Sequence, residues 1–365
     1  METEGIKYAG SKREIIPFLL EVIRPLGVGT VLDGFSGTTR VSQALKKSGY
    51  TVIANDISEW SSVFGVCYLQ NRRPPSYFQP LIDHLNRLPG KEGWFNCHYG
   101  GKDHNGSSVQ EDGKKRVWQI HNTMKLDAIR EEIDRISEDP IDRSVLLTSL
   151  ILAMDRVDSS LGHQASYLKK WSARSYGVMK MAVPKFVLDD RPHEVFQEDI
   201  FNLLQKVEPD LAYFDPPYGS SNNLMPPSRV RYASYYHLWK TVCLNDRPAV
   251  TGAANRRTDV SDQASGSLFE DFRKDPSGEF LVLRALERLI AETRAKNLLL
   301  SYNNYGRATV SEIVGLLNRL SYQHALFEID YRENIMSGMT WTGEWERGRS
   351  GPREKNKEFL FLIRK

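Results

Sequence analysis

Residues 30–56 read TVLDGFSGTTRVSQALKKSGYTVIAND, and this stretch carries the pattern that decides the fold. The apolar run Thr30–Leu32 predicts a short strand, which is followed by a glycine-rich turn. Val41–Lys47 has helical spacing, and Thr51–Ala54 predicts a second strand that is soon followed by an acid, Asp56. A strand–turn–helix–strand unit of this kind places its two strands parallel, with a right-handed crossover. We therefore expect an α/β protein built on a parallel sheet.

The same alternation of strands and helices returns in the last half of the chain. Asp210–Phe214 predicts a buried strand that is followed by another acid, Asp215. A helix, a strand, a helix and two strands are then expected in turn, at 279–296, 297–302, 310–320, 325–329 and 358–363. The last two of these predict an antiparallel hairpin at the C-terminal end of the sheet.

Between these two regions the alternation stops. Three prolines and the glycine-rich stretch 90–113 predict loops, whereas Asn122–Ile136, with Asn122 as N-cap, and Asp142–Val157 predict helices. The simplest architecture is one sheet domain interrupted by a mainly helical insertion. We expect the sheet domain to comprise residues 1–70 and 194–365, and the insertion to comprise residues 71–193.

The composition is that of a globular protein without extreme charge. Of the 365 residues 40% are hydrophobic and 26% are charged, and 49 Lys or Arg against 46 Asp or Glu leave a net charge of +3. This excludes a histone-like polycation but permits a local basic patch. No apolar run approaches the roughly 18 residues that a membrane helix needs, and the start, METEGIKYAG, lacks the order of a secretion signal. The three cysteines form no CxxC pair, so we expect a cytoplasmic protein without disulfides or a metal site.

The most informative motif is Asp215-Pro216-Pro217-Tyr218, directly after a predicted strand. The carboxyl ends of strands in an open α/β sheet are where ligands bind. Proline has no N–H to donate, so the turn is stiff and its carbonyls stay available as acceptors. A carboxylate, a fixed carbonyl and an aromatic ring at one place suit a planar heterocycle with an exocyclic amine. The alternative is a proline-rich turn with a buried tyrosine.

A second motif is the glycine turn DGFSGTT at 33–39, between the first predicted strand and its helix. Glycines there let the backbone approach a ligand, and Asp56 after the next strand stands where an acid accepts bonds from ribose hydroxyls. The GxGxxG spacing of a dinucleotide site is absent, so a nucleoside without phosphates fits better. Near the N-terminus, KYAGSK at 7–12 adds two cations and an aromatic residue in a further glycine turn. An ordinary turn and a solvated segment are the alternatives for these two motifs.

Taken in this order, the motifs resemble the Dam-like, alpha-group class of site-specific DNA adenine-N6 methyltransferases. The resemblance rests on IKYAGSK, VLDGFSGTTRVSQAL, VIANDIS, FQEDIFNLL and LAYFDPPY, and further along on SYYHLW, LLLSYNNYG and KEFLFLIRK. It implies a Rossmann-like class I methyltransferase sheet, mostly parallel with a C-terminal antiparallel hairpin. It also implies that the helical insertion is a target-recognition, DNA-binding domain.

The resemblance further implies roles for individual residues. Contacts to the cofactor S-adenosyl-L-methionine would come from Tyr8, Lys12, Asp33, Gly34, Phe35, Ser36, Gly37, Asp56, Ile57, Asp199, Ile200 and Asp215. Within this set Lys12 would lie near the cofactor carboxylate and Asp56 would hold the ribose. Catalysis on the target base would fall to Asp215, Pro216, Pro217 and Tyr218. The chain departs from the family at Tyr8, Gly34 and Thr39, where many members have Trp, Pro and Gly.

The activity implied is methyl transfer to the N6 amine of an adenine that is flipped out of double-stranded DNA. The protein would be a monomer without membrane association and the modification enzyme of a restriction-modification system, with a cognate restriction endonuclease as a candidate partner. Residues 155–185 hold six Lys or Arg against two acids, and we expect Lys169, Lys170 and Arg174 to face DNA phosphates. A solvated helix face is the alternative for this window.

Other interpretations stay open. The stacking pocket would also serve an RNA adenine or a DNA cytosine-N4 methyltransferase, and a non-catalytic nucleic-acid-binding relative could keep the fold. A dinucleotide-dependent oxidoreductase is disfavoured by the missing GxGxxG. We expect His237 to be a packed histidine rather than a general base, and the stretch 219–278 to order over the base or the DNA.

Overall fold

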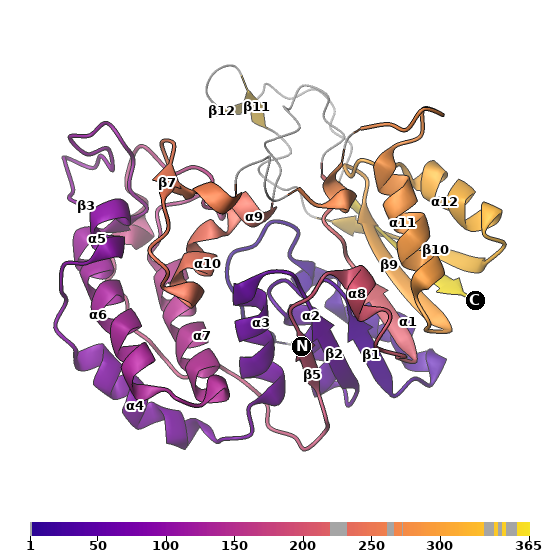
Figure 1. Cartoon of the computed structure of the whole chain (residues 1–365), viewed down its shortest axis with the longest axis horizontal. Coiled ribbons are helices and arrows are strands. Elements are labelled where there is room, and N and C mark those ends of the chain that lie inside the picture. The colour runs from indigo at the N-terminus through magenta and orange to yellow at the C-terminus, as the bar shows by residue number, and fades with distance from the viewer. Residues whose placement is uncertain are drawn as a thin grey trace.

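The computed structural model of the chain describes residues 2–219, 232–260, 266–271, 273–331, 339–341, 345–347 and 356–365. Two parts lie side by side, a sheet covered by helices and a group of helices with little sheet of its own (Figure 1). The expectation for 219–278 falls partly on 220–231, 261–265 and 272, which lie outside the described residues.

The described residues form a central sheet of seven strands in the order β10-β13-β9-β6-β1-β2-β5. The strands are β1 (Thr30–Asp33), β2 (Thr51–Asn55), β5 (Glu194–Phe196), β6 (Leu211–Phe214), β9 (Asn297–Asn303), β10 (Gln323–Tyr331) and β13 (Asn356–Arg364). From β9 to β5 each strand pairs in parallel with the next, whereas β13 runs antiparallel to both β9 and β10. The mostly parallel α/β sheet is therefore confirmed, as is the antiparallel pair formed by its last two strands.

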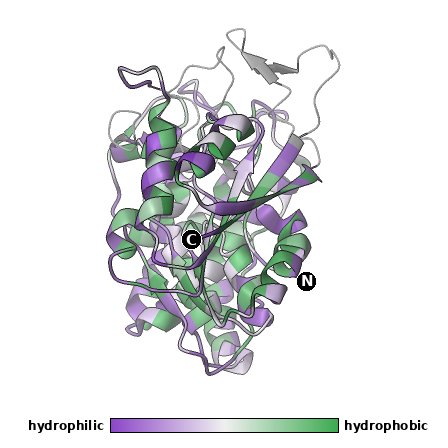
Figure 2. Cartoon of the chain, turned by 90° about the vertical axis from the view of Figure 1, so that its right-hand side faces the viewer, coloured by the Kyte–Doolittle hydropathy of each residue, from purple (hydrophilic) through white to green (hydrophobic). Residues whose placement is uncertain are grey.

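Helices cover both faces of this sheet. One face carries α1 (Ile16–Ile23) and α2 (Arg40–Lys47), and the other carries α8 (Ile200–Leu203), α11 (Leu281–Glu292) and α12 (Val310–Arg319). The alternation of side chains along a strand explains the two layers, because Leu360 and Leu362 of β13 pack with α1 and α2, while Phe359 and Phe361 pack with α11 and α12. The covering helices carry hydrophobic and hydrophilic residues along their length, as amphipathic helices do (Figure 2).

The helical part has a separate core. It contains α3 (Glu59–Gly65), a π-helical turn at Val66–Gln70, α4 (Pro75–Arg87), α5 (Trp94–Tyr99), α6 (Ile120–Ile136) and α7 (Pro140–Arg156). The chain returns to this part after β6, with α9 (Tyr232–Tyr235) and α10 (His237–Leu244), whose Leu238 and Trp239 join the same core. The packing of the helical part thus includes residues on both sides of β5 and β6, while the division at 71–193 stays a prediction.

Short ladders lie outside the central sheet. Among the described residues these are β3 (Gly100–Gly101) with β4 (Trp118–Gln119), β7 (Val250–Thr251) with β8 (Arg256–Arg257), and β11 (Met339–Trp341) with β12 (Trp345–Arg347). The apolar run 145–154 lies buried within α7. Across the described ranges, each helix is too short or too polar to cross a bilayer.

Two predictions about local structure are wrong in the helical part. Prolines 75 and 80 do not break the chain, because α4 begins at Pro75 and contains Pro80. Pro80 lies on the exposed side of the helix, so the Ser76 carbonyl that loses its amide partner is open to water. The stretch 90–113 is also not loop throughout, because α5 lies within it.

The start of α6 differs from the prediction as well. The helix begins at Ile120, and Gln119 takes the N-cap position that we expected of Asn122. The Asn122 side chain, buried inside the helix, instead donates to the carbonyl of Gly177 (2.9 Å) and accepts from the backbone N–H of Met179 (2.8 Å). A contact distant in sequence therefore takes the polar group that a cap would use.

The order of the strands places the functional end of the sheet. The chain leaves β1 toward β2 and β5 on one side, and β6 is followed by β9 on the other side, so the order reverses between β1 and β6. Asp33 at the end of β1 is in register with Tyr213 of β6, two residues before Asp215. Ligands of open α/β sheets bind at such a reversal, outside the carboxyl ends of the strands.

Candidate active site

The glycine turn after β1 is held against both neighbouring strands. The backbone N–H of Gly34 donates to the carbonyl of Tyr213 (2.9 Å), and that of Ser36 donates to the carbonyl of Asn55 (2.8 Å). A Cβ atom at Gly34 would lie 2.7 Å from the ring of Phe214. The ring of Phe214 in β6 thus leaves no room for a side chain at position 34.

Two acids follow the first two strands and face the same space. Asp33 is 1% exposed and accepts a hydrogen bond from Ser42 Oγ (2.6 Å), and its burial raises its pKa to about 7. Asp56 accepts from the backbone N–H groups of Gly37 (2.8 Å) and Ser58 (2.9 Å). Burial also raises the pKa of Asp56, and these two backbone donors oppose that effect.

A buried cation links the turn after β6 to the N-terminal segment. Lys12, in a 3-10 turn at Lys12–Glu14, has its Nζ 3.0 Å from Oδ1 of Asp215 and 2.8 Å from Oε1 of Glu358. The same Nζ donates to the hydroxyl of Tyr218 (3.3 Å) and lies 5.3 Å from the centre of its ring. Burial works to lower the pKa of Lys12, but the two carboxylates outweigh it, so the pKa is raised and Lys12 stays protonated.

Aromatic side chains pack around Tyr8 in the N-terminal segment. The ring of Tyr8 stacks on Tyr236 with centroids 4.7 Å apart, and it lies 5.6 Å from Tyr232 and 5.8 Å from Trp60. The hydroxyl of Tyr236 accepts from the backbone N–H of Ala9 (2.7 Å). These contacts join α3, α9 and α10 of the helical part to the segment that precedes α1.

Tyr8, Lys12, Asp33, Asp56, Asp215 and Tyr218 line one cavity of about 500 Å³. It lies between the carboxyl ends of β1, β2 and β6 and the helices α3, α9 and α10. Every residue predicted for catalysis or cofactor binding lines it, namely Tyr8, Lys12, Asp33, Gly34, Phe35, Ser36, Gly37, Asp56, Ile57, Asp199, Ile200, Asp215, Pro216, Pro217 and Tyr218. The structure therefore brings together three motifs that are far apart in the sequence, while the role of each residue stays a prediction.

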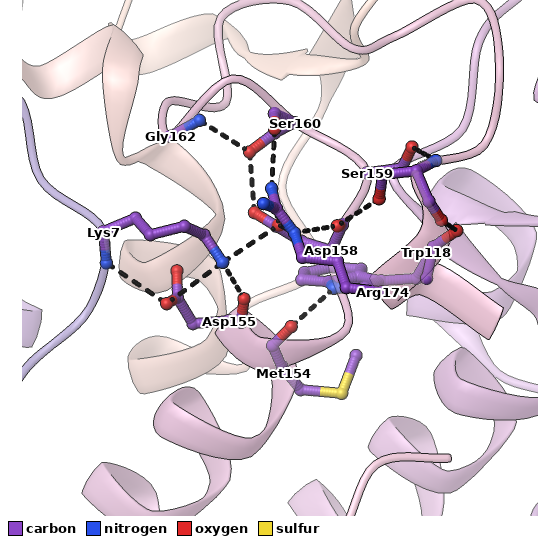
Figure 3. A network of polar contacts seen from close by, with 11 residues as sticks. Lys7, Trp118, Met154, Asp155, Asp158, Ser159, Ser160, Gly162 and Arg174 are labelled. Atoms are coloured by element: carbon purple, nitrogen blue, oxygen red, sulfur yellow. Dashed lines mark hydrogen bonds and ion pairs between the residues drawn. The ribbon is translucent and has the colours of Figure 1, made fainter. Parts of the chain in front are cut away.

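The residues predicted to face DNA divide into two kinds. Lys169 and Lys170 have exposed side chains. Arg174 belongs to a network in which Asp158 lies between Lys7 on one side and Arg174 on the other (Figure 3). Its Nη2 is 2.7 Å from Oδ1 of Asp158 and donates to the carbonyl of Ser160 (2.7 Å). Arg174 thus stabilises the loop after α7 through contacts within that loop.

The same network joins the site to the helical part. Lys7 lies 3.1 Å from Asp158 Oδ1 and 3.2 Å from Asp155 Oδ2, and its backbone N–H donates to Asp155 (3.1 Å). Because Tyr8 follows Lys7 directly, the C-terminal end of α7 fixes the segment that leads into the cavity. His237 is fully buried beneath this region, with Nε2 3.2 Å from the carbonyl of Gln164, so the expectation of a packed histidine is confirmed.

Sequence reasoning did not single out several residues at this site, among them two tyrosines and an acid. Tyr232 of α9 and Tyr236, the N-cap residue of α10, line the cavity, and Glu358 of β13 contacts Lys12. The segment SYYHLW at 234–239 carried a signal for Tyr236 in its paired tyrosines, whereas Tyr232 lies just before this segment. The signal of Glu358 was an acid within the otherwise apolar strand EFLFLI, which is 2% exposed in the fold.

Comparison with a family model and with individual known proteins points to methyltransferases in each case. The model of the family described as D12 class N6 adenine-specific DNA methyltransferase matches residues 8–274. The modification methylase StsI of Streptococcus sanguinis is 26% identical over 87% of the chain and 46% of its own length, and the modification methylase LlaI of Lactococcus lactis subsp. lactis is 24% identical over 94% and 53%. The type II methyltransferase M.NlaIII of Neisseria lactamica is 25% identical over 90% of the chain and 92% of its own length. The chain thus spans about half the length of the first two relatives and nearly all of the third.

Proposed function

The chain belongs to the D12 class N6 adenine-specific DNA methyltransferase family, and on that premise we propose that it methylates the N6 amine of an adenine flipped out of duplex DNA. One observation carries the proposal: the Asp-Pro-Pro-Tyr turn after β6 opens into the same cavity as the glycine turn after β1 and the acid after β2. A methyl donor and a base can then meet in one place, as a direct transfer requires.

The residues of the cavity fit S-adenosyl-L-methionine, which supplies an activated methyl group when it is bound. Asp56 offers carboxylate oxygens to ribose hydroxyls, because its two backbone donors leave acceptor capacity on each oxygen. Ile57 is 67% exposed although it is large and apolar, and with Phe35 and Ile200 it offers apolar surface to a heterocycle. Asp199 caps α8 through the N–H of Phe201 (2.9 Å) at the same wall.

The turn after β6 would hold the target base. Asp215 and the carbonyl of Pro216 present acceptors for the two hydrogens of the amine, which favours a nitrogen with its lone pair free for attack. Tyr218 offers its ring for stacking and is itself supported by Tyr302, at 5.2 Å between centroids. A methylated amine must lose one proton, and the carboxylate of Asp215, whose pKa burial raises to about 7, can accept it near neutral pH.

The helical part would read the DNA. We assign target recognition to residues 71–193, and we add 232–260 because α9 and α10 pack within the same core. Lys169 and Lys170 would face phosphates from this part. StsI and LlaI are named modification methylases, so a role beside a cognate restriction endonuclease belongs to the proposal, as does action by a monomer.

The test is to incubate the protein with S-adenosyl-L-methionine labelled in its methyl group and with duplex DNA, RNA or no nucleic acid. We expect label in duplex DNA alone, and no label in DNA when Asp215→Asn replaces the wild type. Label in RNA, or equal transfer by Asp215→Asn, would refute the proposal. Measuring cofactor binding by calorimetry on both proteins separates a lost reaction from a lost ligand.

A further inference from the structure

Glu358 is a buried acid that the proposed chemistry does not itself use. It lies in β13 among apolar neighbours and is 2% exposed. Its Oε1 is 2.8 Å from Nζ of Lys12 and also accepts a hydrogen bond from the hydroxyl of Ser301 in β9. A buried carboxylate destabilises a fold unless it is paired, so an acid retained in this strand calls for a reason beyond packing.

The position of Glu358 in the strand aims it at the site. Along β13 it alternates with Phe359 and so shares the face of Leu360, the face covered by α1 and α2. Lys12 stands just before α1, and its ammonium lies between Glu358 and Asp215, 2.8 and 3.0 Å from their nearest oxygens. One cation is therefore shared by two carboxylates, one of which, Asp215, is the proposed acceptor of a hydrogen bond from the amine of the target base.

We propose that Glu358 is a positioning residue of the proposed methyl transfer, which holds Lys12 so that its charge bridges two carboxylates and does not neutralise Asp215 alone. The inference rests on the proposed function for its meaning, but its electrostatic consequence can be measured without a substrate. If Lys12 served Asp215 alone, the carboxylate would be a weaker base. With Glu358 present, Asp215 both stays near the cation and keeps its ability to take a proton.

The electrostatics of the corner support this assignment. Burial contributes most to raising the pKa of Asp215, Lys12 lowers it, and Glu358 raises it again. The ionisable groups that face or couple to Asp215 come from every element packed here, namely Lys12, Asp33, Glu358 and the tyrosines Tyr8, Tyr213, Tyr218 and Tyr232. The tyrosines stay protonated at neutral pH because burial raises each of their pKa values, so the charges that matter are those of the lysine and the acids.

The direct experiment is Glu358→Gln, which keeps the size and an acceptor but removes the charge. The Asp215 carboxyl is titrated by carbon-13 NMR in protein labelled at aspartate, with the signal assigned from Asp215→Asn. We expect the pKa of Asp215 to fall by about one unit, because a negative neighbour is lost. Glu328→Gln is the matched control, since Glu328 lies on the adjacent strand β10 with its side chain 49% exposed, and it should leave the titration unchanged.

The kinetic readout follows from the same shift. In single turnovers the acid limb of the rate should move to lower pH in Glu358→Gln, so that the rate at pH 6 relative to the plateau rises about fivefold. Cofactor affinity should stay within twofold. An unchanged Asp215 titration in Glu358→Gln overturns the inference, whereas a shifted titration in a protein that methylates no DNA would leave the inference standing and overturn the proposed function.

If Glu358→Gln does not fold, a second pair of variants tests the inference. Lys12→Met/Glu358→Gln removes both charges of the pair, and it is compared with Lys12→Met alone. Asp215 should titrate at lower pH in the double variant, since only the single variant keeps a carboxylate beside it. Equal titration in the two proteins would contradict a direct effect of the Glu358 charge on Asp215, on which the inference depends.

Discussion

Asp215 and Tyr218 have different proposed roles, the first as a hydrogen-bond acceptor and the second as a stacking ring. Asp215→Asn replaces the carboxylate by a neutral amide and should lower the methylation rate by about a hundred- to thousandfold, as for other groups aimed at a reacting centre.

Tyr218→Ala should lower kcat/KM by about ten- to a hundredfold through lost stacking, with cofactor affinity little changed. Tyr218→Phe keeps the stacking ring and loses the hydroxyl, which accepts a long hydrogen bond of 3.3 Å from Lys12. This variant should therefore retain most of the activity. Equal losses in the two Tyr218 variants would show that stacking is not its role.

Asp33 illustrates an acid that costs stability where it stands. Its pKa is raised to about 7 by burial, so in the folded state it keeps its proton at pH values where the unfolded chain has already lost it. Its favourable contribution is complete below the unfolded pKa of about 4 and is lost as pH rises to about 7. Asp33→Asn should therefore gain stability over the wild type as pH rises from 4 to 7, by up to about 4 kcal/mol.

Chemical denaturation of both Asp33 proteins at pH 4, 5.5 and 7.5 checks this expectation. The difference in unfolding free energy should grow with pH and then level off. A difference that is constant with pH would mean that folding leaves the pKa of Asp33 unchanged. Since Asp33 lines the cavity, we expect the more stable Asp33→Asn protein to bind the methyl donor less tightly.

Among the elements, those set by local patterns could be predicted and those set by distant contacts could not. The strands β1, β2, β6, β9, β10 and β13 follow apolar runs bounded by turn residues, so their existence was predictable. Helix α4 was missed because three prolines outweighed the apolar spacing of Phe78, Ile82 and Leu85, which are its buried residues. Helix α5 begins where the side chain of Asp127 accepts from the N–H groups of Phe95 (3.0 Å) and Asn96 (2.7 Å). That cap comes from α6, and no local pattern could reveal it.

The site shows the same division. The motifs at 7–12, 33–39 and 215–218 all contribute residues to the cavity lining, and for the last two the βαβ topology explains this, because it brings the carboxyl ends of neighbouring strands together. Tyr236 lines the cavity and Glu358 contacts Lys12, and both come from elements whose place in the fold depends on long-range packing. A position in a strand or helix tells which residues share a face, but not which other element that face meets.

The loop after α7 carries two cations with different expected roles, Arg174 in stability and Lys170 in DNA binding. Arg174→Ala leaves Asp158, whose side chain is 4% exposed, without one of its two cations and should lower the unfolding free energy by about 1–3 kcal/mol. Lys170→Ala should leave stability unchanged, weaken binding to duplex DNA and reduce the salt dependence of binding by about one ion. Denaturant titrations and binding at several salt concentrations give both quantities. A loss of stability in Lys170→Ala, or none in Arg174→Ala, would reverse these assignments.

For the molecule as a whole, the cavity lies where the two parts meet. Strand ends of the sheet form one wall, and α3, α9 and α10 of the helical part form the other. Lys7 fastens the approach to the cavity onto α7, so that the segment carrying Tyr8 and Lys12 is fixed by both parts. We infer that the arrangement lets one part hold DNA while the other presents the methyl donor to a single extruded base.

Methyl transfer to the N6 amine of adenine is checked by identifying the modified base. Unmethylated duplex DNA is incubated with the protein and S-adenosyl-L-methionine, digested to nucleosides and analysed by mass spectrometry, with Asp215→Asn in parallel. We expect N6-methyladenine as the product of the wild type and its loss in the variant. N4-methylcytosine as the product, or N6-methyladenine formed equally by Asp215→Asn, would contradict it.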